Sequence, residues 1–138
     1  MPRAVLRSSE ARLPRKRAAR VSFVVAALLI LGTYARAVSV LSGNVSGTLS
    51  AANSPYRVTG SITVPIAQTL TIEAGVVIKF QSGTGLTVNG TLVSNGTAAE
   101  PVYLTSVADD SIGGDFDGIP SAGAAGDWGE LLFDNANA

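Results

Sequence analysis

The chain has 138 residues and a mass of 14.0 kDa, which fits one domain of ordinary size and excludes a large multidomain enzyme. It contains neither cysteine nor histidine. Thiol nucleophiles, disulfides, histidine bases and Ser-His-Asp triads are therefore excluded. Fifteen glycines and only 6% aromatic residues also argue against a helical bundle.

The net charge of zero conceals two unlike parts. Eight of the ten basic residues lie within residues 1–37, with Glu10 as the only acid there. Residues 38–138 hold two basic residues, Arg57 and Lys79, and nine acids, so their net charge is −7. Such asymmetry is typical of a targeting segment followed by an acidic body.

Residues 21–35 (VSFVVAALLILGTYA) are uncharged and mostly apolar, and they follow the basic block. Small side chains at Ala35 and Ala37 complete an A-x-A site, so residues 1–37 are predicted to be a signal peptide cleaved after Ala37. The alternative is an uncleaved anchor, although about 20 apolar residues are needed to span a bilayer. Because no aromatic residues are interleaved with the basic ones, nucleic-acid binding is rejected.

The body is predicted to be a series of short strands. Residues 38–55 are rich in Ser, Gly, Asn and Ala, which predicts a flexible lead-in or an N-terminal cap. From residue 56 onward, an apolar-Thr-apolar triplet occurs at residues 62–64, 70–72 and 86–88. Each triplet places two apolar side chains on one face of a strand and a Thr on the other. An ungapped match of residues 70–77 with residues 86–93 indicates a repeat.

The strand pattern leaves two all-β architectures open. The Asn89-Gly90 pair is a hairpin signal and favours an antiparallel β-sandwich or barrel. Apolar residues that recur at like positions favour a β-solenoid, in which each coil stacks on the previous one.

A family resemblance favours the solenoid. The order of segments from residue 56 to 133 resembles the first coils of bacterial cell-surface and secreted proteins with a right-handed parallel β-helix, the pectin-lyase-like fold. The segments that carry the resemblance are residues 60–64 (GSITV), 69–80 (TLTIEAGVVIKF), 86–92 (LTVNGTL), 96–98 (GTA), 100–106 (EPVYLTS), 109–115 (DDSIGGD) and 126–129 (GDWG). The resemblance implies an exported β-helix over residues 56–138, in a superfamily where some members bind or degrade polysaccharides.

Five aspartates form a candidate calcium loop, since Ca²⁺ prefers carboxylate and carbonyl oxygens. They are Asp109, Asp110, Asp115, Asp117 and Asp127. An EF-hand is excluded, because Gly113 and Ala124 would occupy its first and last ligand positions. The alternative is a solvated surface loop without a metal.

The basic residues give little support to catalysis. Arg57 and Lys79 form no recognisable cluster, so we expect no catalytic residue in this segment and a structural or adhesive role in contact with extracellular polysaccharide. The alternative is the N-terminal part of a polysaccharide lyase or glycoside hydrolase. Residues 131–138 end just after a predicted strand and contain no capping element, which predicts that the chain is the N-terminal portion of a longer protein.

Overall fold

The protein was analysed as a computed structural model that describes residues 38–134. The predicted signal peptide and its cleavage site at Ala35 and Ala37 lie outside the described residues. Within residues 38–134 no helix is long and apolar enough to cross a membrane.

The described chain is built almost entirely of short strands. These are β1 (Ser39–Asn44), β2 (Gly47–Leu49), β3 (Tyr56–Val64), β4 (Thr69–Ile72), β5 (Val77–Phe80), β6 (Leu86–Val88), β7 (Thr91–Ser94), β8 (Tyr103–Ser106) and β9 (Leu131–Phe133), with one 3₁₀ turn at Ala51–Asn53. Every strand pair among the described residues is parallel. This confirms the parallel β-helix and rules out the antiparallel sandwich.

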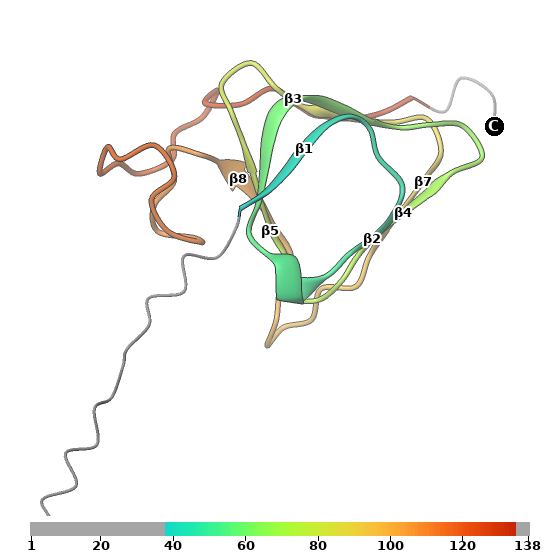
Figure 1. Ribbon diagram of the computed structural model, residues 1–138, viewed down its shortest axis with the longest axis horizontal. Coiled ribbons are helices and arrows are strands. Elements are labelled where there is room, and N and C mark those ends of the chain that lie inside the picture. The colour runs from blue at the N-terminus through green and yellow to red at the C-terminus, as the bar shows by residue number, and fades with distance from the viewer. Residues whose placement is uncertain (1–37, 135–138) are drawn as a thin grey trace, which may run out of the picture. The chain divides into compact units, whose positions relative to one another are not determined.

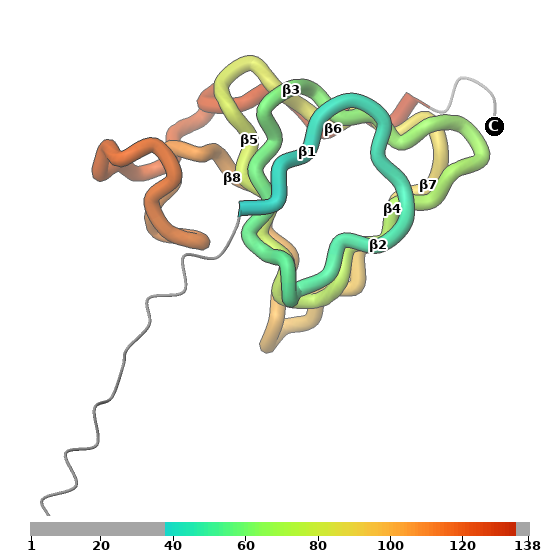
Figure 2. The backbone as a smooth tube through the Cα atoms, in the orientation of Figure 1, coloured from blue at the N-terminus to red at the C-terminus, as the bar shows by residue number. Residues whose placement is uncertain are grey.

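The strands form the stacked coils seen in Figures 1 and 2. One sheet has the order β8-β5-β3-β6-β9, with β1 also beside β3, and the other has the order β2-β4-β7. The long strand β3 pairs with β5 through its first half and with β6 through its second half. A single strand of one coil is therefore divided in the next coil by the turn at residues 81–85. Within the range 38–55, β1 and β2 form the first described coil.

The core is a column of apolar side chains stacked from coil to coil. Ile62 lies beside Leu86, and Leu70 lies beside Leu92, in neighbouring coils. Burial of these side chains is the main favourable term for folding. The buried apolar residues are Leu49, Tyr56, Val58, Ile62, Val64, Leu70, Ile72, Val76, Ile78, Phe80, Leu86 and Val88.

The apolar-Thr-apolar triplets occupy different sheets from those that the self-match suggests. The triplet at residues 62–64 pairs in register with the triplet at residues 86–88. The triplet at residues 70–72 belongs to β4 and pairs with β7 in the other sheet. The ungapped match of residues 70–77 with 86–93 is therefore not the coil repeat. It arises because any strand with one face in the core repeats the same alternation.

The Asn89-Gly90 pair forms a corner between two sheets and no hairpin. The backbone N–H groups of Asn89 and Gly90 both donate to the carbonyl of Val64 in the neighbouring coil, at 2.9 and 3.1 Å. A Cβ on Gly90 would collide with the carbonyl oxygens of Pro65 and Gln68. Glycine is needed here because the two coils approach backbone to backbone.

We predict that Ile62→Ala lowers the free energy of unfolding by about 2–5 kcal/mol, because it opens a cavity in the column of stacked side chains. Ile66→Ala is the matched control, since Ile66 is 62% exposed while Ile62 is 0% exposed. The control should change stability by less than about 0.5 kcal/mol. Urea unfolding followed by circular dichroism measures both, and equal losses would contradict the core assignment.

Candidate functional site

The feature that departs most from the regular coils is a long segment between β8 and β9. We call residues 107–128 the acidic excursion. Leu86 of β6 pairs with Leu131 of β9, 45 positions later, whereas Ile62 pairs with Leu86 only 24 positions later. The excursion accounts for the added length and extends beside the coils, in orange at the left of Figures 1 and 2.

Aspartate side chains shape the outer part of the excursion. Asp115 Oδ1 accepts hydrogen bonds from the backbone N–H of Asp117 (3.0 Å) and of Gly118 (2.6 Å), and Asp117 Oδ1 accepts one from Ile119 (2.9 Å). Such contacts between an Asp and the backbone two or three residues later stabilise turns. Two of the five aspartates, Asp115 and Asp117, thus have a conformational role.

Asp110 and Ser121 close the excursion into a loop. The backbone N–H of Asp110 donates to the Ser121 carbonyl at 3.3 Å, and the Ser121 N–H donates to Asp110 Oδ2 at 2.7 Å. The Ser121 hydroxyl also donates to the Ala108 carbonyl at 2.6 Å. These three contacts close residues 108–121 into a loop.

Asp109 has a different role, because it connects the excursion to β8. Its carboxylate accepts hydrogen bonds from Thr105 Oγ1 at 2.6 Å and from Ser111 Oγ at 2.5 Å. The hydrogen bonds from Ser111 and Thr105 lower the pKa of Asp109 below its usual 3.8, because they stabilise the carboxylate form. The Asp109 carboxylate therefore already has hydrogen-bond partners within the protein.

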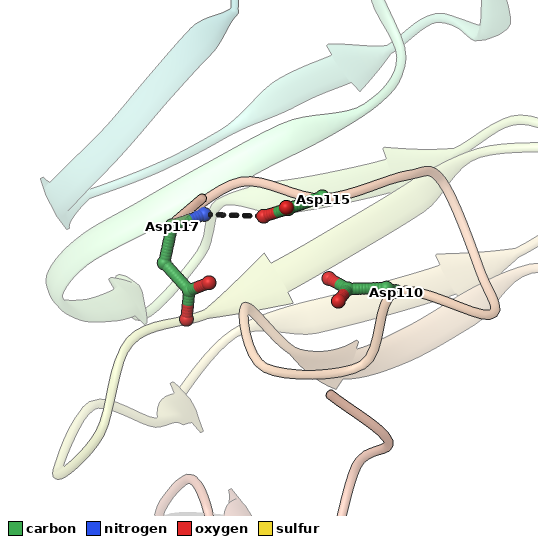
Figure 3. Close-up of side chains that lie close together, drawn as sticks. All are labelled: Asp110, Asp115 and Asp117. Atoms are coloured by element: carbon green, nitrogen blue, oxygen red, sulfur yellow. Dashed lines mark hydrogen bonds between the residues drawn. The ribbon is translucent and has the colours of Figure 1, made fainter. Parts of the chain in front are cut away.

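Three of the five predicted calcium ligands come together in the structure. Carboxylate oxygens of Asp110, Asp115 and Asp117 lie within 4.8 Å of one another and face a common space (Figure 3). Asp110 Oδ1 is buried and has no hydrogen-bond partner in the described structure. Asp109 and Asp127 do not belong to this group, and Asp127 Oδ2 instead accepts the Ala124 N–H at 2.6 Å. A hard cation with oxygen ligands fits the three grouped carboxylates.

Lys79 lies beneath the excursion. It points away from the core between Ile78 and Phe80 of β5, as strand alternation predicts, yet it is 0% exposed. Its ammonium donates to the Asp109 carbonyl at 2.7 Å and to the Gly114 carbonyl. Burial lowers the pKa of Lys79 more than the surrounding aspartates raise it. The sequence contained no signal for this burial, because the covering segment begins 28 residues later.

The excursion rejoins the coils through an aromatic contact. Trp128 stacks on Phe80 of β5 with ring centroids 4.4 Å apart and an interplanar angle of 17°. The next residue, Gly129, donates its N–H to the Thr84 carbonyl at 2.7 Å. Trp128 is partly buried and packs against the core.

A polar groove lies where the excursion ends. It has a volume of about 180 Å³ and combines hydroxyl, carboxylate and backbone groups on the outer side of β6. A Cβ on Gly85 would come within 2.7 Å of the Glu130 carbonyl oxygen, so glycine permits the close approach of the two chains at the groove. Sequence reasoning missed this site. Its lining residues are Ser61, Gly83, Gly85, Leu86, Thr87, Gly129 and Glu130.

We predict that Asp109 makes stability depend on acid pH. Because its pKa is lowered in the folded protein, its contribution is fully present above 3.8 and is lost as the pH falls through the lowered value. Asp109→Asn should therefore be less stable than the wild type at pH 7, and the difference should shrink in acid. Asp134→Asn is the control, since the Asp134 carboxylate accepts no hydrogen bond within residues 38–134. Urea unfolding against pH would contradict the assignment if the difference stayed constant.

Comparison with known proteins identifies the family. The family described as the pectate-lyase-like β-helix domain matches residues 43–129, more than half of the chain. One curated relative, Protein bark beetle of Drosophila melanogaster, is 38% identical over 56 residues, which is 41% of this chain and 2% of that protein. No solved structure matches the chain significantly. The parallel coils and the match over residues 43–129 together show that the chain belongs to the family of pectate-lyase-like β-helix domains.

Proposed function

We propose that this β-helix is an exported module that acts outside the cell or at its surface as a structural or adhesive element in contact with carbohydrate. The predicted signal peptide supports export, and the family supports a carbohydrate-related role. The observation that carries the proposal is the polar groove beside the excursion, with side chains of Ser61, Thr87 and Glu130 along it.

The groove is small enough to suggest that a ligand rests against it and is not enclosed by it. Its volume of about 180 Å³ is below the range of roughly 300–1,000 Å³ that encloses a drug-sized ligand. A ligand that rests one unit in the groove and extends over the sheet suits such a site. Polysaccharide chains have this form, and their hydroxyls pair with hydroxyl and carboxylate groups.

The placement of the two basic residues supports a role without catalysis in this segment. Hydrolysis of a polysaccharide uses a pair of carboxyl groups, whereas Glu130 is the one carboxyl residue in the lining of the groove, and β-elimination uses a base that a basic residue can supply. Lys79 is buried and its ammonium is bonded to two carbonyls of the excursion. Arg57 is half-buried, and its Nε is enclosed without a partner. Neither group lines the groove.

A second candidate is the N-terminal part of a polysaccharide lyase or glycoside hydrolase. The family itself favours it, because its description refers to pectate lyase. In that case the reacting groups would be contributed by residues other than those of the groove. The two candidates differ in whether the chain alone turns over a substrate that it binds.

We predict that the full chain co-sediments with an insoluble polysaccharide and releases no unsaturated or reducing product from it. Thr87→Val should weaken binding about three- to tenfold, because it removes one hydroxyl from the groove. Thr71→Val is the matched control, since Thr71 is an equally half-buried outward Thr on β4 in the other sheet. Equal binding by all three proteins would contradict the groove, and product release would select the lyase or hydrolase.

We also propose that Asp110, Asp115 and Asp117 bind calcium, on the evidence of the partnerless Asp110 Oδ1 and the 4.8 Å clustering. Titration calorimetry with calcium chloride should give one site with a dissociation constant of about 10⁻⁴–10⁻³ M, the range of extracellular modules. Asp110→Asn should abolish the heat, because it removes the buried charge while leaving an acceptor for Ser121. Asp127→Asn should leave it unchanged, and heat lost in both variants or absent in the wild type would refute the site.

A further inference from the structure

We propose that Lys79 is a latch: its Nζ–H donors hold the outer part of the acidic excursion, residues 109–118, on the outer face of β5, while a separate anchor at Trp128 holds the point of re-entry. The excursion can thus release from the sheet without unwinding the coils. The inference is independent of carbohydrate contact and of calcium.

The contacts of the ammonium are the first evidence. Nζ donates to the carbonyls of Asp109 (2.7 Å) and Gly114, which flank the turn at residues 110–113. One side chain of β5 therefore closes a turn that belongs to a segment about 30 residues later. Loss of these donors would leave two backbone carbonyls unpaired against the sheet, which is costly for buried groups.

Close packing around the Lys79 stem is the second evidence. A Cβ on Gly113 would lie 3.1 Å from Val77 Cγ1, 3.6 Å from Lys79 Cε and 3.6 Å from Pro55 Cβ. Gly113 has a φ of +74°, so a side chain here is opposed by the backbone as well as by space. On the other side the Phe116 ring lies 4.8 Å from Nζ, at cation–π distance.

The charges around Lys79 indicate that its hydrogen bonds to the excursion matter more for the latch than its positive charge. Asp109, Asp110, Asp115 and Asp117 face Lys79 from the excursion, and Arg57 is its in-register neighbour on β3. Among residues 38–134 no carboxylate oxygen forms an ion pair with Nζ. Burial lowers the pKa of Lys79 more than these aspartates raise it, so the cost of burying the charge exceeds its attraction to the carboxylates. A neutral amine keeps two N–H donors for the two carbonyls.

The re-entry point is held by contacts that do not involve Lys79. Trp128 stacks on Phe80, Gly129 N–H donates to the Thr84 carbonyl at 2.7 Å, and Leu86 N–H donates to the Glu130 carbonyl at 2.9 Å. The pairing of β6 with β9 then continues the coil. Asp109 is also bonded to Thr105 of β8 at 2.6 Å, so the part of the excursion that can detach by itself lies between Asp109 and the anchor at Trp128.

Hydrogen exchange of the full chain, read by mass spectrometry in the presence of EDTA, tests the latch. In Lys79→Met the amides of Asp110 and Ser111 should exchange about tenfold faster or more, because Lys79 no longer fixes the Asp109 carbonyl beside them. The amides of β3 and β6 should keep their wild-type protection. Arg57→Met is the matched control, since it removes an equal charge from the next strand without a hydrogen bond to the excursion, and it should leave the excursion unchanged.

Two further variants keep the test decisive. Lys79→Arg retains N–H donors and should stay near wild-type protection. Gly113→Val crowds Val77 and Lys79 from the excursion side, so it should release the same amides even if Lys79→Met unfolds the coils. The latch is overturned if Lys79→Met or Gly113→Val leaves the excursion as protected as in the wild type, or if Arg57→Met loosens it equally.

Discussion

In-register parallel pairing from coil to coil is the constraint on which the rest of the structure depends. Because each strand pairs with the strand one coil away, side chains at like positions must stack, and Ile62 with Leu86 shows the result in the core. The same rule acts on the outer face, where Arg57, Lys79 and Thr105 form one row across β3, β5 and β8. A single strand register thus determines which side chains stack in the core and which form rows on the outer surface.

The acidic excursion lies where that register allows added residues. A coil tolerates added length only where two strands are joined by a loop, and the junction of β8 with β9 is such a place. The added residues leave and return beside the same strand, since Lys79 contacts the start of the excursion and Phe80 its end. Two adjacent residues on opposite faces of β5 therefore hold the excursion: Lys79 bonds to its start on the outer face, and Phe80 packs against its end at the core.

Much of the fold could be predicted from the sequence, because strand alternation and turn residues are local properties. Parallel pairing was favoured by family resemblance, while the pattern alone left a sandwich open. The register could not be predicted, since residues 70–72 and 86–88 look alike but lie in different sheets. A local pattern identifies the face that is buried and leaves the partner strand undetermined.

The site was less predictable, because it depends on contacts between distant segments. Five aspartates were visible as a group, yet the structure separates Asp109 and Asp127, which bond to nearby hydroxyl and backbone groups, from the three that cluster. The burial of Lys79 depends on a segment that covers it from 30 residues away. Lys79 is one of two basic residues among nine acids in residues 38–138, and its position explains its role: a long flexible stem on an outward strand position is what an acidic loop needs to dock through its carbonyls.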